Sequence, residues 1–499
     1  MARTHNSRRS RIEASRKFSL SDLARASTTP VGLSVGLVVL CFLFGGGSRA
    51  DILSLMWLRP AAVLLLGAGL LTLRREHLSR YPALFALLGA VWALAVLHLL
   101  PLPPSLWQAL PGRDIIVRID DLAGIENVWR PLSMHPEGSW NALWALVIPT
   151  AALVLAAQLD ARAQRTLLLV VLILGAISIT LAAAQFAGGT SSGAYFYRIT
   201  NRGAPPGLFA NRNHQAVFLA SLFPLLAAWW RISRSEQRDH PPRSVDRQTV
   251  IALAAGLAVV PLILVTGSRA GLVASLVGFF GVLWITGLPA KPTPVKRSSK
   301  SKFSQVSRYA PMAIIGLGVV LLATVTVTLG RGTAFDRLFG DAISGDMRAD
   351  ITPIVWGLAQ DYGPWGSGIG SIVPVFRMHE PEAMLAPAYL NHVHNDYLEI
   401  ALTAGIPGVL LVAAAIVAVG LAAYRLVRRR QESSRASQGG ERSLAKAGLT
   451  IIVIMLIASA ADYPLRTPAL SCLLMFACVW LWRGGSRETS ATHISRSGD

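Results

Sequence analysis

Twelve apolar blocks recur along this chain of 499 residues, and they constrain its fold more than any other feature. A helix that crosses a bilayer needs about 20 predominantly apolar residues, because its backbone must satisfy its own hydrogen bonds in lipid. The blocks therefore predict an all-α polytopic membrane protein with about 12 transmembrane helices. They fall at 31–44, 60–73, 82–100, 140–158, 166–187, 213–230, 249–267, 270–288, 309–329, 396–424, 447–463 and 468–482.

The formal charge of +20 is explained by membrane topology. If the N-terminus is cytoplasmic, 33 of the 47 Lys and Arg residues fall in inside segments and 14 in outside segments. This bias follows the positive-inside rule, so nucleic acid is not an expected partner. We expect both termini to be cytoplasmic, in a bacterial inner membrane protein whose functional face is periplasmic.

The pattern also predicts the domain boundaries. Residues 1–29 form a basic cytoplasmic arm, 30–482 the transmembrane domain and 483–499 a cytoplasmic tail. One large outer loop, 330–394, interrupts the apolar blocks. Within it, Thr352 and Pro353 predict the start of a short amphipathic helix, which the glycine-rich stretch 363–370 ends.

Arg269 lies in a tight turn, 266–271, between two apolar blocks. One explanation is an arginine that extends to lipid headgroups. An arginine between two glycines at a tight hairpin that faces the bundle is a better candidate for holding a lipid phosphate, because its planar fork matches phosphate oxygens.

A second polar stretch leads directly into the block at 213–230. Arg202 and Arg212 lie beside this expected helix N-terminus, where unpaired N–H groups and the helix dipole attract anions. They are candidates for a pyrophosphate site, and the sequence does not say which of the two faces it. Asn211 or Asn213 is expected to cap the helix or support the site.

The segment Asn391–Gly408 runs from a polar cluster into an apolar block. Polar groups at the mouth of a membrane helix are costly and usually functional. Histidine is the usual group that takes a proton from an attacking hydroxyl near neutral pH, so His394 is the candidate general base. Tyr397 and Glu399 are expected to orient it or to bind a sugar hydroxyl. A continuous helix would place one mostly small face beneath it, at positions 394, 398, 401, 405 and 408.

The pair His392 and His394 also raises the possibility of a metal site. Residues at i and i+2 face apart on a helix, and no other His or Cys cluster stands nearby in the sequence. We therefore expect neither a metal ion nor a cofactor.

Four of these pieces, in this order, resemble the O-antigen ligase/polymerase family of bacterial inner-membrane glycosyltransferases. The resemblance covers about 200–410, and this chain has Ser-Arg-Ala-Gly where the family often has Ser-Arg-Gly. The pieces are Gly207-x-Phe209-x-Asn211-x-Asn213, Ser268-Arg269-Ala270-Gly271, Arg348 followed by 361–370, and His394-Asn395 with Gly405 and Gly408.

The resemblance implies a GT-C-like helical bundle with its core at about 200–424. It implies metal-independent transfer of a glycan from undecaprenyl diphosphate to a hydroxyl on the periplasmic face. His394 would then be the base, and Arg269 with Arg202 or Arg212 would hold the pyrophosphate. Arg348 and Asn395 would support substrate binding.

Several functions share these residues. The leading prediction is ligase-type transfer of O-antigen, or a related surface glycan, to a lipid A–core acceptor. A polymerase of O-antigen or exopolysaccharide, or a protein O-oligosaccharyltransferase, would use the same donor chemistry. A lipid-linked saccharide flippase would place ionisable groups along a central passage, whereas these blocks are nearly free of them.

Overall fold

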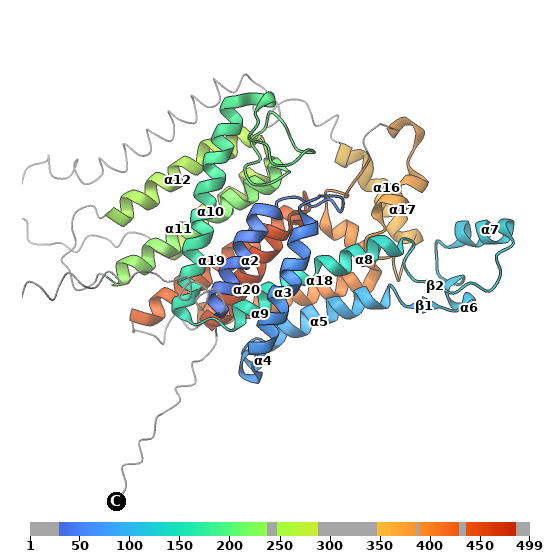
Figure 1. Ribbon diagram of the computed structural model, residues 1–499, viewed down its shortest axis with the longest axis horizontal. Helices are drawn as coiled ribbons and strands as arrows, with labels where there is room; N and C mark the ends of the chain where they lie inside the picture. The colour runs from blue at the N-terminus through green and yellow to red at the C-terminus, as the bar shows by residue number, and fades with distance from the viewer. Residues whose placement is uncertain (1–28, 237–246, 288–346, 386–388, 429–435, 486–499) are drawn as a thin grey trace, which may run out of the picture.

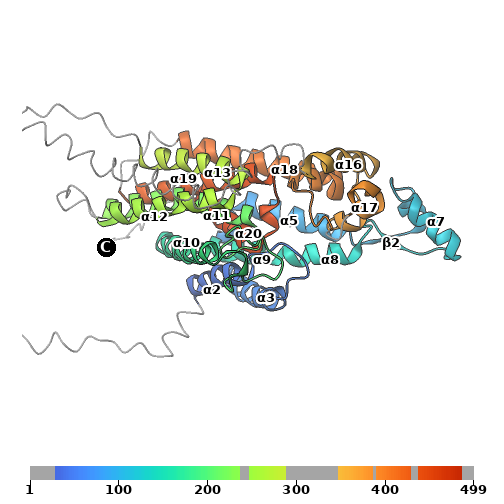
Figure 2. The same cartoon turned by 90° about the horizontal axis from the view of Figure 1, so that it is seen from above.

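The computed structural model describes residues 29–236, 247–287, 347–385, 389–428 and 436–485. The described part is a bundle of helices that run side by side (Figures 1 and 2). Within it, nine helical segments are long and apolar enough to cross a membrane, and two shorter apolar helices accompany them. The chain is therefore a multi-pass helical membrane protein.

Eleven of the twelve apolar blocks fall on described helices. The block at 309–329 lies outside the described residues, as do 1–28, part of the 330–394 loop and 486–499, so the total of twelve helices stays a prediction. The helices on these blocks are α2 (Pro30–Phe44), α3 (Leu55–Thr72), α5 (Pro82–Leu97), α8 (Pro136–Ala145) with α9 (Val147–Ala157), α10 (Ala161–Gly188), α11 (Arg212–Glu236), α12 (Arg247–Thr266), α13 (Arg269–Thr286), α18 (Asp396–Arg428), α19 (Ala436–Ser459) and α20 (Pro468–Gly485).

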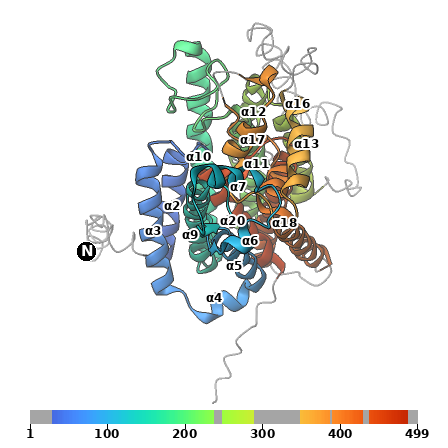
Figure 3. The same cartoon turned by 90° about the vertical axis from the view of Figure 1, so that its right-hand side faces the viewer.

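The remaining elements lie outside the apolar blocks, and most of them are short. Several of them, α6, α7, α16 and α17, gather at one end of the bundle, which Figure 3 views from outside. The antiparallel pair β1–β2 leads toward this end, with Pro101 opposite Pro131. The remaining elements are α4 (Arg75–Arg80), β1 (Pro101–Leu102), α6 (Pro104–Trp107), α7 (Asp114–Ala123), β2 (Arg130–Pro131), η1 (Gly189–Ser191), α16 (Met347–Asp361), α17 (Ile372–His379), η2 (Glu382–Met384) and η4 (Pro464–Arg466).

Helix α11 packs against α10, α12, α13 and α19. Small residues set the closest of these approaches. A Cβ atom added at Gly271 of α13 would lie 2.4 Å from the Cβ of Ala216, and one at Gly278 would lie 2.7 Å from the Ala220 carbonyl oxygen. Such small-residue faces let membrane helices pack closely, and here they fix the joint between α11 and α13.

The amphipathic helix expected in the 330–394 loop is present as α16, but its start was predicted too late. It begins at Met347 and contains Pro353, and it buries Ile351, Val355 and Leu358. The glycine-rich stretch after it is confirmed as a break, because Gly366, Gly368 and Gly370 all have positive φ angles.

Helix α18 is interrupted near its start. Gly405 adopts φ 59° and ψ −156°, and the Ile406 amide donates to the Pro364 carbonyl over 2.8 Å instead of continuing the helical ladder. The amides of Ser367 and Gly368 donate to the Leu402 and Thr403 carbonyls, both at 2.9 Å. The break therefore holds the first turns of α18 against the 363–370 segment.

The expectation of one continuous small face from position 394 to 408 is wrong. His394 precedes the helix, which begins at Asp396, and the helix path changes at Gly405. Position 405 requires glycine for another reason than close packing of a neighbouring helix. A Cβ atom added there would lie 2.2 Å from the Pro364 oxygen.

Substitution of Gly405 tests this interruption. We expect Gly405→Ala to lower the free energy of unfolding by about 1–3 kcal/mol or more, because this combination of φ and ψ is adopted almost only by glycine. The control is Gly420→Ala in the same helix, where nothing lies within 4 Å of an added Cβ. Because alanine is favoured over glycine in a helix interior, the control should be neutral or stabilising. Thermal unfolding of the purified proteins checks both, and equal effects would contradict the account.

Candidate active site

His394 lies in the loop just before α18, in a backbone conformation that is uncommon for a side-chain-bearing residue. Its φ angle is 59°. Asn395 follows it and caps α18, because its Oδ1 accepts from the amides of Tyr397 (3.1 Å) and Leu398 (3.2 Å). Left-handed residues outside glycine concentrate at functional sites, where surrounding contacts hold them.

The imidazole of His394 is held by Asp462, which lies between α19 and η4. Nδ1 of His394 is 2.9 Å from Oδ1 of Asp462. The histidine side chain is 27% exposed and the aspartate 1% exposed. The pair thus combines a buried carboxylate with a ring that still reaches the surface.

Polar side chains from the start of α11 lie around Asp462. Nδ2 of Asn211 lies 3.4 Å from its Oδ2, the Asn213 side chain is also a partner, and Nε2 of buried His214 lies 4.0 Å away. Burial would raise the pKa of Asp462, but the hydrogen bond from His394, the nearby His214 and the hydrogen bond from Asn213 lower it to about 2. The carboxylate therefore stays ionised across the physiological pH range.

An ionised carboxylate only accepts hydrogen bonds, so the hydrogen of neutral His394 resides on Nδ1. Its Nε2 then carries the lone pair. This is the arrangement of a general base that a carboxylate orients.

Three imidazole rings surround Tyr463. The ring centroids of His392, His394 and His214 lie 4.5, 4.9 and 5.2 Å from the centroid of Tyr463. Burial raises the pKa of Tyr463, while the charge of Arg348 in α16 opposes that rise. Arg348 is thus brought within electrostatic range of the cluster, although it comes from the 330–394 loop.

Glu399 contacts His392 and not His394. Its Oε1 lies 3.1 Å from Nδ1 of His392 and 3.1 Å from Nη2 of Arg466, and its Oε2 accepts from the Val393 amide over 3.0 Å. Arg466 also donates to Asp396 over 2.9 Å. Glu399 therefore fixes the loop that carries the two histidines.

Tyr397 is engaged elsewhere as well. Its hydroxyl donates to the Leu456 carbonyl of α19 over 2.7 Å. Two of the residues expected to orient His394 instead anchor the start of α18, and the orienting partner is Asp462.

The structure distinguishes between the two candidate arginines near α11. Nη1 of Arg212 lies 3.3 Å from the carbonyl oxygen of Thr266, which is three residues before the exposed Arg269. Arg202 instead donates to the Thr190 carbonyl over 3.2 Å and lies 5.3 Å from the Tyr195 ring centroid. Arg212, and not Arg202, is thus placed beside the turn that carries Arg269.

Asn211 connects these two halves of the site. Its Oδ1 accepts from the Asn213 amide over 2.8 Å, while its Nδ2 contacts Asp462. The N-terminus of α11 therefore carries both Arg212 and the donors to Asp462. The expected base and the expected anion-binding arginines belong to one end of the bundle.

Three important residues were missed by the sequence reasoning: Asp462, Tyr463 and Arg466. The expected helix at 447–463 included two of them, whereas α19 ends at Ser459. A signal existed, because Asp462 and Arg466 occur within five residues of each other, where one apolar block ends and the next is about to begin. Ionisable groups in such a position are costly unless they pair.

Within the described ranges, no three His, Cys, Asp or Glu side chains gather closely enough to hold a metal ion. His392 and His394 each bond a different carboxylate.

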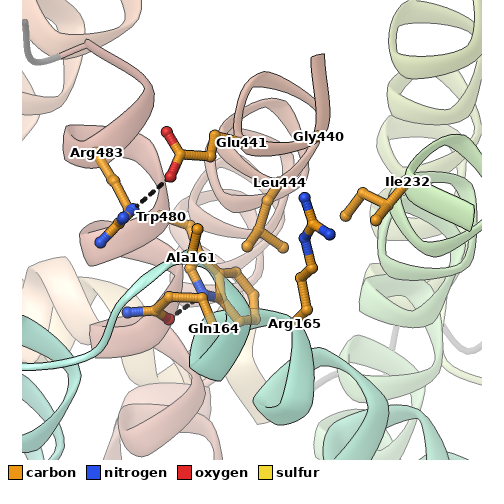
Figure 4. A pocket seen from close by; sticks show the side chains of 9 residues that line it. All are labelled: Ala161, Gln164, Arg165, Ile232, Gly440, Glu441, Leu444, Trp480 and Arg483. Carbon is orange, nitrogen blue, oxygen red and sulfur yellow. Dashed lines mark hydrogen bonds and ion pairs between the residues drawn. The ribbon is translucent and has the colours of Figure 1, made fainter. Parts of the chain in front are cut away.

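A small cavity lies where α10 and α19 begin and α11 and α20 end (Figure 4). Arg165, Glu441 and Arg483 line it, and Arg483 pairs with Glu441 at 3.0 Å. The cavity has room for about one water molecule. It is too small to hold a saccharide or a lipid.

Residues 252–413 match the family model described as O-Antigen ligase. A search of curated proteins found no match for the chain. The matched segment contains Arg269, Arg348 and His394 and leaves out Arg212 and Asp462. The resemblance to the O-antigen ligase family is thereby confirmed over this segment, and it supports a membrane glycosyltransferase of the O-antigen ligase/polymerase type.

Proposed function

We propose that the protein transfers a glycan from undecaprenyl diphosphate to an acceptor hydroxyl at the periplasmic face, most simply as a ligase that uses lipid A–core as acceptor. The observation that carries this proposal is the hydrogen bond between Nδ1 of His394 and Asp462, because it leaves Nε2 as the basic atom. The positive-inside bias supports a periplasmic position for this end of the bundle.

In the proposed reaction, the acceptor hydroxyl gives its proton to Nε2 of His394 as its oxygen attacks the anomeric carbon of the donor. The bond from that carbon to the diphosphate oxygen breaks, and its electron pair leaves with undecaprenyl diphosphate. The negative charge of Asp462 stabilises the imidazolium, which later returns its proton to solvent or to the released diphosphate.

Arg212 and Arg269 are proposed to hold the diphosphate. Both begin helices, α11 and α13, whose N-terminal dipoles favour negative charge. Arginine forks bind phosphate oxygens bidentately. The two guanidinium groups would therefore already be in position to stabilise the negative charge that develops on the leaving diphosphate. Arg348 would contribute from the 330–394 loop.

Deletion of the gene in its own host distinguishes ligation from polymerisation. For a ligase, we expect undecaprenyl-linked polymer to accumulate, because chains are built but not transferred. Accumulation of single lipid-linked repeat units would show a polymerase instead. If neither species accumulates and the plasmid-borne gene changes neither level, the proposed donor is wrong. Lipid extraction followed by mass spectrometry provides the measurement.

The placement of the arginines predicts unequal effects of the same substitution. Arg212→Lys keeps the charge but loses the planar fork, so we expect transfer to fall by roughly 10²-fold, as for loss of one transition-state donor. The matched control Arg202→Lys should stay within about twofold, because Arg202 is bound in its own loop.

Transfer rates of the purified variants, compared at equal amounts of folded protein, test this difference. An Arg202→Lys protein impaired as strongly as Arg212→Lys would contradict the assignment.

A further inference from the structure

A second group of arginines surrounds Tyr389, five residues before His394. Nη2 of Arg49, which follows α2, lies 2.6 Å from the Tyr389 hydroxyl. The guanidinium carbons of Arg49 and of Arg377 in α17 lie 5.2 and 4.7 Å from the Tyr389 ring centroid. Both charges therefore lie against one aromatic ring, where cation–π attraction supports them.

One carboxylate accompanies these arginines. Asp51 accepts two hydrogen bonds from Arg49, at 2.9 and 2.8 Å, and its side chain is 56% exposed. The hydrogen bonds from Arg49, together with the charge of exposed Arg198, lower the pKa of Asp51. Asp51 thus pairs with Arg49 and feels the charge of Arg198, while Arg377 lies against the Tyr389 ring, so three arginines and one carboxylate leave a net positive cluster.

The bidentate pair shows that the Arg49 guanidinium is oriented to donate two parallel hydrogen bonds to two oxygens of one oxyanion. Because Asp51 is more than half exposed, its ion pair is screened by water and contributes little to stability. A ligand with a phosphate or carboxylate group can therefore replace it at low cost.

This cluster is built from other residues than the proposed diphosphate site, yet it lies close to the reacting end. The Ala210 amide, next to Asn211, donates to the Gly46 carbonyl over 3.0 Å, three residues before Arg49. Tyr389 is five positions before His394 in the sequence, so their Cα atoms lie within about 18 Å of each other. A short oligosaccharide spans that distance.

We propose that Arg49, Arg198 and Arg377 form an oxyanion site for a phosphate or carboxylate group on the saccharide substrate. Asp51 occupies the Arg49 fork until that group displaces it. The identity of the ligand as a saccharide rests on the proposed function, whereas oxyanion binding itself does not. A lipid headgroup offers the same phosphate chemistry. The alternative role of the cluster is structural, as a set of ion pairs that holds the loops together and binds no ligand.

Inorganic phosphate is the probe, and thermal unfolding of the full chain in phospholipid-free detergent is the readout, because ligand that binds the folded state raises its stability. All variants carry Arg269→Gln, which weakens the separate diphosphate site. In this background, we expect saturable stabilisation by phosphate. Arg377→Gln should raise the apparent Kd at least tenfold.

Asp51→Asn should change the apparent Kd for phosphate in the opposite direction to Arg377→Gln. Removal of the internal carboxylate should lower the apparent Kd for phosphate several-fold, because the ligand no longer competes with it. The control is Arg118→Gln, an exposed arginine of α7, which should change nothing. If the cluster is purely structural, Asp51→Asn lowers stability and leaves phosphate binding unchanged or weaker. That result overturns the proposal.

Nanodiscs identify the source of the oxyanion. Phosphate should bind equally in discs of phosphatidylcholine alone and in discs with phosphatidylglycerol. Loss of phosphate binding only in the anionic discs would assign the cluster to lipid headgroups and overturn the saccharide assignment. None of these measurements requires glycan transfer. If His394 proved not to be the general base, the expected phosphate-binding results would stay the same.

Discussion

The hydrogen bond between His394 and Asp462 lies where three parts of the chain that are distant in sequence meet. Asp462 follows α19, His394 precedes α18, and the N-terminus of α11 supplies Asn211 and the buried ring of His214. A carboxylate that is 1% exposed is costly to bury unless donors surround it. The hydrogen bonds from His394 and Asn211 to Asp462 thus bring the helix ends together and fix the imidazole.

The supporting structure around this pair follows from the same requirement. His394 has a left-handed backbone, so neighbouring contacts must hold it. Asn395 caps α18 behind it, Glu399 and Arg466 hold the loop before it, and the break at Gly405 fixes the first turns of α18 against residues 363–370. The glycine-rich segment therefore acts on the site through the backbone.

Much of the fold was predictable because lipid leaves few choices to a backbone. The eleven apolar blocks that are described all became helices, and the polar ends of those helices contained His394, Arg212 and Arg269. The break at Gly405 was not predictable, because it depends on hydrogen bonds to a segment about 40 residues earlier.

The partner of His394 was hidden for a similar reason. Apolar residues continue past the end of α19 at Ser459, so hydropathy placed Asp462 inside a helix. Which of Arg202 and Arg212 lies beside the turn that carries Arg269 depends on the local contacts of each side chain, which sequence spacing does not reveal.

The rate of glycan transfer by purified His394→Gln protein, measured in a single turnover with an undecaprenyl diphosphate-linked donor, tests the central claim most directly. Glutamine keeps the size and polarity of the side chain but removes the basic nitrogen. A general base contributes roughly 10²- to 10⁴-fold, so we expect a loss in this range at an unchanged unfolding temperature. Transfer at the wild-type rate would show that His394 does not take the proton.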